Sequence, residues 1–447
     1  MKQVLIFLIA VLTITGCKKE ANTPNKIPPP PPPPPPSLSI SGIKPATGAY
    51  NTAVTITGTG FSSTLTDDSV YINGNPASIS NANDSQLVAI VQMYTGTGDV
   101  VVKVGGVAKT GPLFTYIWTA SVTPYAGIPN TDLFTGTDVD GPANTAGFFR
   151  PTGLVLDNSG NLFVFDAGNS KIREITPPVG NGQAQVSTYA TTMPVPTSYF
   201  QTIEPPIFFG LAGQGGVFFA DGQLVSNGTA QTWNPAPNLS AGGTATAFPT
   251  GIYWAPTGAY MDGSGNLYVG SRDNVVIIYK NGPASWASIG TPLQAGDQNG
   301  TYVFNAQNQP VPADEPSFNG PTDVVVDAAG NIFVADQGNN QIREITPAGV
   351  VSTFAGSGSS SEKDGTGTAA GFAQPTYITI DSSSNLYVLD YNSAGGQTLR
   401  IITPAGQVST LCTQCSVVAG GIVSDPAGHT IYVSEYDAGV INQVSIY

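Results

Sequence analysis

The sequence predicts an all-β protein in which a six-bladed β-propeller follows a small immunoglobulin-like β-sandwich. Three observations support this fold class. A unit of four short strands recurs from residue 120 onward, the strand that the last unit lacks stands before the first unit, and a segment with sandwich-like strand spacing precedes them all. The 53 Gly and 37 Pro among 447 residues supply turns, and 40% hydrophobic residues in strand-length runs can fill blade cores.

The clearest copy of the repeat spans residues 321–356. Its strands are expected at 324–326, 332–335, 342–345 and 350–354, each rich in β-branched or aromatic residues. The turns between them contain Gly and Asn, which adopt positive φ at little cost. We therefore expect a four-stranded antiparallel meander, which is one blade of a propeller.

Five copies of this unit align directly. The first two openings are 256 − 151 = 105 residues apart, whereas the later ones are 375 − 321 = 54 and 420 − 375 = 45 residues apart, so the first interval holds two units. A degenerate sixth unit is therefore expected to begin near residue 207. The five aligned openings are Pro151, Pro256, Pro321, Pro375 and Gly420.

The last copy has three strands where the others have four. The run ASVTPYAG at 120–127 resembles the missing fourth strand, VSTFAG. We expect this run to complete the last blade, because that pairing closes the ring and leaves no long sheet edge exposed. Residues 117–447 are thus expected to form one propeller.

The pattern P-x-G-hhh-D-x-x-G-N-h-Y/F-V-x-D-x-x-N-x-x-I-R, followed by VSTFAG, resembles the NHL repeat. The inter-blade runs at 140–151 and 364–375 resemble it too. The match is specific in three copies, partial in two and weak near residue 207. The resemblance implies a six-bladed propeller. The family includes lyases, RNA-binding proteins and extracellular binding modules, so the resemblance does not by itself imply an activity.

Residues 1–16 are expected to be a signal peptide. Lys2 supplies a positive charge, and the apolar run from Val4 to Leu12 is too short to span a bilayer. The small residues before Cys17 resemble a bacterial lipoprotein cleavage site, which implies lipidation of Cys17. An ordinary secretory signal is the alternative.

A short charged run, Lys18-Lys19-Glu20, follows Cys17 and resembles the export signal of surface lipoproteins. We expect a lipid-anchored protein of the outer membrane, exposed on the surface of a Gram-negative bacterium and attached to the membrane through its acyl anchor only. Residues 17–37 form the tether. The nine prolines from Pro28 to Pro36 favour a stiff polyproline II spacer of about 28 Å over a ligand for a proline-binding domain.

Residues 38–116 are expected to form a separate β-sandwich. Their strand-like runs are separated by Gly, Asn and Pro turns at the spacing typical of sandwiches. The segment SISGIKPATGAYNTAVTITGTGF resembles the opening of IPT/TIG domains, which are immunoglobulin-like modules. That resemblance implies a spacer or support, and we find no binding constellation in the segment. The matching positions are Pro45, Gly48, Val54, Thr55, Ile56, Gly58, Gly60 and Phe61.

The net charge of −14 excludes two classes of partner. With 15 basic against 29 acidic residues, the chain lacks the basic surface that nucleic-acid binding requires. The same charge disfavours docking on anionic lipid headgroups. The RNA-binding branch of the NHL resemblance is therefore disfavoured.

Two cysteines besides Cys17 form a C-x-x-C motif, Cys412 and Cys415. A redox motif would need a βαβ context to lower a thiol pKa, and a zinc site would need a second pair of ligands. We expect a local disulfide, with reduced thiols as the alternative.

The single histidine, His429, argues against an enzyme. One imidazole cannot build the ligand or base sets that propeller lyases and zinc hydrolases use, and His429 lies in a turn. The chain also lacks a G-x-S-x-G elbow, a P-loop and an H-E-x-x-H motif. We predict no catalytic residues, no metal ligands and no cofactor.

Carboxylates recur at fixed repeat positions. Side chains that recur in every blade usually serve each blade, so we expect the first set below to cap the following turn. The recurring arginines are expected to pair with neighbouring blades, and calcium bound at 138–141 is an alternative role for that acidic turn. The sets are Asp157, Asp262, Asp327, Asp381 and Asp425; Asp166, Asp336 and Asp390; and Arg173, Arg343 and Arg400.

Aromatic residues gather where the repeat is interrupted, at 180–255 and 281–316. Exposed rings stack on the apolar faces of sugars, whereas the alternative is that most of these rings pack inside the degenerate blade. Trp233 looks least like a strand residue and is the first candidate for an exposed platform. The predicted ligand-binding residues are Trp233, Tyr253, Trp254 and Trp286.

Together these features predict a surface lipoprotein that binds a ligand without transforming it. The expected ligand is an extracellular polysaccharide, by resemblance to glycan-capturing surface lipoproteins that carry similar spacer modules. A cell-surface protein partner is the first alternative. The second is a propeller lactonase or polysaccharide lyase that uses carboxylates and a divalent cation.

Overall fold

The computed structural model describes residues 37–447 apart from several internal segments. Cys17 and the proline tether lie outside the described residues. Within this part of the chain the only helices are three single 3-10 turns, and none is long and apolar enough to span a membrane. The segments left out are 131–135, 191–209, 213–215, 219–222, 227–228, 233–255, 263–265, 272–273, 281–284, 291–293, 305–309, 313, 315 and 393–394.

The first domain is a β-sandwich. Its hydrogen-bonded strands follow the order β1-β3-β6-β5-β4-β7-β8-β2, and β5 pairs with β4 through its first residues and with β6 through the rest. The strands are β1 (Ser39–Lys44), β2 (Thr47–Gly48), β3 (Ala53–Thr59), β4 (Asp68–Ile72), β5 (Asn75–Asn83), β6 (Gln86–Ile90), β7 (Gly98–Val104) and β8 (Val107–Tyr116).

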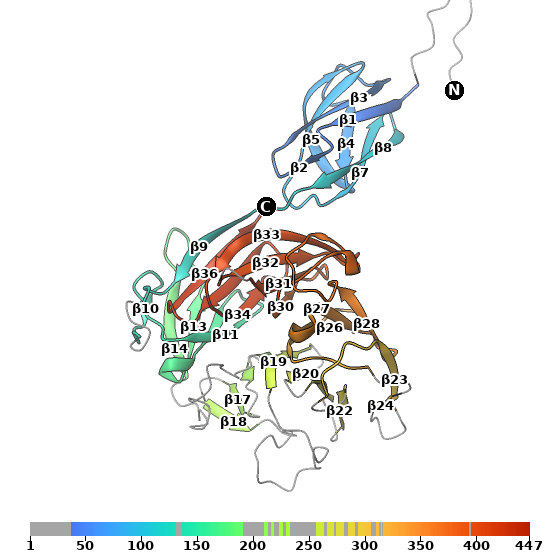
Figure 1. Cartoon of the computed structure of the whole chain (residues 1–447). Helices are drawn as coiled ribbons and strands as arrows, with labels where there is room; N and C mark the ends of the chain where they lie inside the picture. The colour runs from blue at the N-terminus through green and yellow to red at the C-terminus, as the bar shows by residue number, and fades with distance from the viewer. Residues whose placement is uncertain are drawn as a thin grey trace, which may run out of the picture.

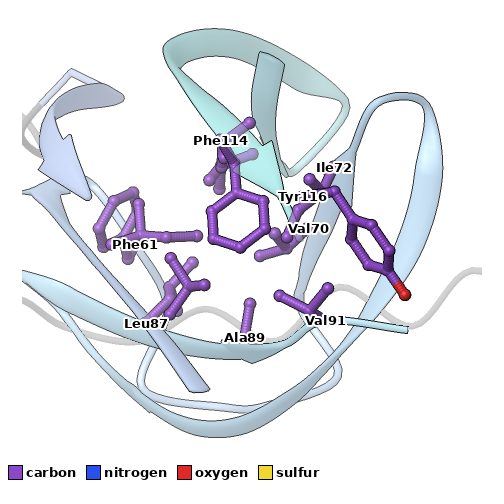
Figure 2. Packing of buried hydrophobic residues seen from close by; sticks show 12 residues of the cluster. Phe61, Val70, Ile72, Leu87, Ala89, Val91, Phe114 and Tyr116 are labelled. Atoms are coloured by element: carbon purple, nitrogen blue, oxygen red, sulfur yellow. The ribbon is translucent and has the colours of Figure 1, made fainter. Parts of the chain in front are cut away.

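The sandwich has its own hydrophobic core, formed by alternate residues of these strands. Phe61, Leu87 and Phe114 meet in its middle, and Val70 and Ile72 pack beside them (Figure 2). Alternation places one face of each strand inward, so a domain of this size can fold around a single core. The predicted sandwich is confirmed.

The remaining strands form a ring of separate antiparallel sheets, which is a propeller (Figure 1). We name each blade after its innermost strand. From the innermost strand outward, the blades are β11 (Pro151–Leu156), β12 (Leu162–Asp166), β13 (Lys171–Thr176), β14 (Gln185–Ala190) and β10 (Gly141–Pro142); β15 (Gly210–Ala212), β16 (Gly216–Phe218), β17 (Gln223–Ser226) and β18 (Thr229–Thr232); β19 (Pro256–Met261), β20 (Leu267–Ser271), β21 (Val275–Lys280) and β22 (Ser285–Ile289); β25 (Pro321–Val326), β26 (Ile332–Asp336), β27 (Gln341–Ile345), β28 (Val350–Ala355), β23 (Gly300–Phe304) and β24 (Pro310–Pro312); β30 (Pro375–Ile380), β31 (Leu386–Tyr391), β32 (Gln397–Ile402), β33 (Gln407–Ser416) and β29 (Gly365–Thr366); and β34 (Ala419–Ser424), β35 (Thr430–Glu435), β36 (Val440–Ile446) and β9 (Ala120–Ala126). The 3-10 turns are η1 (Ala167–Asn169), η2 (Gln337–Asn339) and η3 (Gly367–Ala369).

In five of these sheets the four strands nearest the axis have five residues or more. The sheet β15–β18 has strands of only three or four residues, and it begins at Gly210, in the interval where the spacing predicts the degenerate unit. The propeller is confirmed, and a count of six blades rests on this short sheet.

The predicted closure of the ring is also confirmed. Strand β9 leaves the sandwich and pairs antiparallel with β36, from Ala120 opposite Ile446 to Ala126 opposite Ile441 (Figure 1). The last blade therefore takes its outermost strand from the segment that precedes the first blade.

Hydrophobic clusters between neighbouring blades hold the ring together. One cluster joins Val276 and Ile278 of the β19 blade to Val324 and Val334 of the β25 blade. A second joins the β25 and β30 blades in the same way. Each blade thus buries its two faces against the neighbouring blades, as the sheets of a propeller do.

The sandwich and the propeller share a packed junction. Trp118 contacts the cores of both domains, and Thr119 and Tyr447 exchange backbone hydrogen bonds of 2.8 and 3.2 Å. The ring of Tyr94, on a sandwich loop, stacks on His429 with 3.5 Å between ring centroids. The lone histidine thus has a structural contact at the domain boundary.

Candidate functional site

The aspartates that end the innermost strands cap the turns that follow them, as predicted. In each of five blades the carboxylate accepts a hydrogen bond from the backbone N–H four residues later. For Asp157 this bond is 2.7 Å, and the Asn161 amide also donates to the second carboxylate oxygen over 2.9 Å. The equivalent backbone bonds of Asp262, Asp327, Asp381 and Asp425 are 2.8–2.9 Å.

A second set of aspartates forms buried ion pairs with the recurring arginines. Asp336 accepts hydrogen bonds from the Asn319 backbone over 2.8 Å and from Arg343 over 3.2 Å, and both side chains of the ion pair are fully buried. The guanidinium lies over the buried ring of Phe318. The same arrangement recurs at Asp166 with Arg173 and at Asp390 with Arg400.

The prediction that these arginines pair with neighbouring blades was wrong. Each pairs with an aspartate of its own blade, because the two residues stand on adjacent strands of one hairpin. Each also bonds the segment that leads into that blade. Arg173 reaches Asp140 over 2.6 Å, and Arg400 reaches Asp364 over 2.9 Å. These hydrogen bonds and ion pairs hold each blade against the segment that leads into it.

The acidic turn at 138–141 is engaged in the same way. Asp138 forms ion pairs with Lys171 and Arg173, and Asp140 accepts bonds from Arg173 and from the Thr188 backbone. Calcium at this turn would have to displace these cations. Across the described residues no three acidic, histidine or cysteine side chains converge as a metal site.

The described propeller contains a cavity on its axis. It has a volume of about 670 Å³ and is lined by the innermost strands β11, β19, β25, β30 and β34. Its lining extends onto the turns that follow these strands, at Asn158, Ala328, Ser382 and Pro426. The cavity therefore extends from near the starts of the innermost strands to the turns that follow them.

One layer of this cavity departs from the repeat. The third residue of the innermost strand is glycine in three blades, at Gly153, Gly258 and Gly421. It is Asp323 in the β25 blade and Tyr377 in the β30 blade. Glycine is needed where neighbouring strands approach closely: a Cβ atom on Gly258 would overlap Oδ1 of Asp323. Asp323 and Tyr377 are the large side chains of this layer.

The Asp323 carboxylate contacts both neighbouring blades. Oδ2 accepts a hydrogen bond of 3.0 Å from the backbone of Ile378 in the β30 blade, and Oδ1 accepts one of 2.9 Å from Val324 while lying against Gly258 of the β19 blade. Among the described residues no Lys, Arg or His forms an ion pair with it.

Burial raises the pKa of Asp323 to about 7, and the two backbone N–H groups oppose this rise only in part. Burial also raises the pKa of Tyr260, and the nearby charge of Asp262 adds to that rise. The cavity therefore holds a carboxyl group that changes its charge near neutral pH.

The described part of the structure does not test the predicted aromatic binding residues. Trp233, Tyr253 and Trp254 lie outside the described residues, and Trp286 stands on β22 opposite Tyr279, with only its backbone described. Their role in binding stays a prediction. Cys412 and Cys415 lie in β33 with Cα atoms 5.7 Å apart, which suits a disulfide, and their oxidation also stays a prediction.

Sequence reasoning missed Asp323, although the sequence held a signal. We sought functional carboxylates among residues that recur in every blade, and Asp323 is an exception at a repeat position that otherwise favours glycine. Side chains that replace glycine in one blade only are not needed by the blade itself, so they are better candidates for function.

Two family matches agree with this architecture. Residues 38–116 match the IPT/TIG domain, and residues 318–345 match the NHL repeat. No curated protein matches the sequence.

Several solved structures of bacterial proteins have a similar fold. A structural-genomics protein of unknown function from Bacteroides thetaiotaomicron is 16% identical, with a TM-score of 0.52 over 93% of this chain and 99% of that one. An auxiliary nutrient binding protein from the same organism is 14% identical, with a TM-score of 0.50 over 92% and 97%. Virginiamycin B lyase from Staphylococcus aureus is 14% identical, with a TM-score of 0.42 over 74% and 99%. At these identities the first two likenesses show the fold alone: a sandwich followed by a propeller.

Proposed function

We propose that this chain is a surface lipoprotein whose propeller binds an extracellular polysaccharide without transforming it. In this proposal Cys17 carries the acyl anchor, the proline run is a spacer, the IPT/TIG domain is a support, and the propeller is the binding head. We count the β15–β18 sheet as its sixth blade, because its innermost strand stands between β11 and β19 in the ring. The name of the nutrient binding protein of similar fold is compatible with this role.

The observation that carries the proposal is the axial cavity. A volume of about 670 Å³ suits a small ligand or the end of a chain, and its lining combines tyrosine rings, hydroxyl groups and strand backbone. Its turn aspartates already accept hydrogen bonds within their own blades. A cavity with bonding groups but with most of its carboxylates engaged is better suited to binding than to acid–base chemistry.

Native affinity electrophoresis tests this function. The chain from residue 17, with Cys17→Ser to prevent lipidation, would be run through gels that contain neutral, acidic or amino-bearing polysaccharides. We expect retardation by at least one of them. Trp233→Ala tests the predicted platform outside the described residues, and Tyr377→Ala tests the cavity. Loss of retardation in only one variant would locate the ligand.

Retardation by no polysaccharide would contradict the proposed ligand class and favour a protein partner. Shortening of the polysaccharide during the run would contradict a purely binding role. The same gels therefore separate the three functions.

An enzyme is the second candidate because of Asp323. A carboxyl group with a pKa of about 7 in a cavity could remove a proton from a bound sugar acid, the step that begins β-elimination by a polysaccharide lyase. A lyase would produce unsaturated sugar ends that absorb in the ultraviolet, and Asp323→Asn would abolish this absorbance. No rise in absorbance with uronic acid polymers would exclude this candidate.

A further inference from the structure

The lining of the axial cavity carries several acidic side chains. Five aspartates line it, Asp157, Asp262, Asp323, Asp327 and Asp381, and no Lys, Arg or His stands among the lining residues of the described chain. The wall of this cavity is therefore acidic.

Charges in such a cavity act on a ligand more strongly than charges on an open surface. The walls exclude water and concentrate the field, so a cation is drawn inward and an anion is repelled. The overall charge of −14 has the same sign. Neutral ligands gain nothing from this field, so the field selects for a positive group.

The position of Asp323 defines where a positive group would be held. The four other aspartates follow the ends of the innermost strands and use their oxygens to cap turns, whereas Asp323 is the third residue of β25. Among the described residues each of its oxygens accepts one backbone hydrogen bond, and a carboxylate oxygen can accept more than one. The carboxyl group has no cationic partner among the described residues, and a bound ammonium group would lower its pKa and favour the ionised form.

An ammonium group fits this position better than a metal ion. Calcium takes six to eight oxygen ligands, usually from several carboxylates, but in the described lining Asp323 is the one carboxylate that does not follow a strand end, and no three acidic, histidine or cysteine side chains converge. An ammonium group needs few acceptors and is also attracted by aromatic faces. Tyr260 and Tyr377 line the same cavity.

We propose that the axial cavity binds a ligand that carries a protonated primary amine, with the ammonium group at Asp323. Within the proposed function, on which this inference rests, the ligand class becomes an amino sugar unit of an extracellular polysaccharide. In this arrangement Asp323 receives the amine of the sugar unit inside the cavity.

The test compares two sugars of the same length and linkage that differ in whether their amines are free or acetylated. A β-1,4-linked glucosamine tetramer and its N-acetylated form would be titrated calorimetrically at pH 6.5 into the chain from residue 17 with Cys17→Ser. We expect the amine form to bind at least about tenfold more tightly, because acetylation removes the charge-assisted hydrogen bond. This comparison needs no variant, so it holds even if a variant fails to fold.

Two variants locate the amine. Asp323→Asn should bring the affinity ratio of the two sugars close to one, whereas Glu362→Gln, which removes an exposed charge outside the cavity, should leave the ratio unchanged. Circular dichroism would check that both variants fold.

The outcomes separate the inference from the function. Equal binding of both tetramers would overturn the amine site but keep a glycan-binding head. Amine selectivity that survives Asp323→Asn would also overturn it. Binding of calcium that depends on Asp323, without amine binding, would assign the cavity to a metal. Binding of simple alkylamines with no affinity for any sugar would keep the amine site and overturn the polysaccharide.

Discussion

Replacement of Asp323 by Asn should make the propeller less sensitive to alkaline pH. Asp323 is enclosed by the innermost strands of three blades, and its charged form is poorly hydrated there. The neutral amide has nearly the same shape. The folded pKa of about 7 lies above the ordinary value of 3.8, so the folded state prefers the protonated acid.

The sign and size of the effect follow from this difference in pKa. Below pH 3.8 the acid is protonated in both states and Asp323 costs nothing. As pH rises, the unfolded chain ionises first, and the loss of stability is complete above the folded pKa of about 7. Between pH 5 and pH 8.5 the loss is roughly 3 kcal/mol, because two of the three pKa units are traversed there at about 1.4 kcal/mol each.

The assay is a pair of melting curves at each pH. An entropy of unfolding near 2 cal/mol/K per residue over residues 117–447 converts this loss into a shift of about 4 °C. The difference in Tm between Asp323→Asn and the wild-type chain should therefore become more positive by about 4 °C between pH 5 and pH 8.5. Glu362→Gln controls for the general effect of removing one negative charge.

A difference in Tm that stays constant across this pH range would refute the reasoning. It would mean that Asp323 ionises in the folded protein as easily as in water, through contacts with residues outside the described part of the chain. An opposite trend would mean that its charged form is the stabilised one.

Three further perturbations test the framework. Arg343→Met should lower the free energy of unfolding in urea by about 3–5 kcal/mol, since it leaves a buried aspartate without its partner; a loss below 1 kcal/mol would show that the pair is not needed. Gly420→Ala should cost about 1–3 kcal/mol in the same assay, because its Cβ would overlap a carbonyl oxygen of the β11 blade. Gly396→Ala is its control, with the nearest atom 3.4 Å away, and equal losses would contradict the steric argument. Cys412 and Cys415 should resist alkylation until a reductant is added, as mass spectrometry would show; labelling of the untreated protein would exclude the disulfide.

The fold was largely predictable because each blade repeats the same local pattern. Runs such as Val324–Val326 have strong strand propensity, and the missing strand of the last copy had a visible match at 120–127. The extra edge strands were not predicted. β10 and β29 are the pairs Gly141–Pro142 and Gly365–Thr366; Gly and Pro are depleted in strands, and two residues are too few to show a strand pattern, so the pairing depends on the sheet edge that lies beside them.

The site was harder to predict from the sequence. Capping by Asp157 and its equivalents could be inferred, because the aspartate and the backbone N–H that it caps are only four residues apart in the sequence. The partners of Arg173 could not, because they depend on which strands become neighbours and on where the entry segment folds back. Identifying Asp323 as a site residue requires two observations. The sequence shows that it departs from the repeat, but only the structure shows that its position faces the axis.

The strand that closes the ring also determines how the molecule carries mechanical load. β9 follows directly from the sandwich, through residues 117–119, and pairs with β36 along its whole length (Figure 1). A pull on the sandwich, while the propeller holds a ligand, is transmitted first to β9. Tension along the strand is shared by all its hydrogen bonds to β36 at once, whereas tension across it would break them one after another. The direction of the pull therefore decides how long the pairing of β9 with β36 lasts under load.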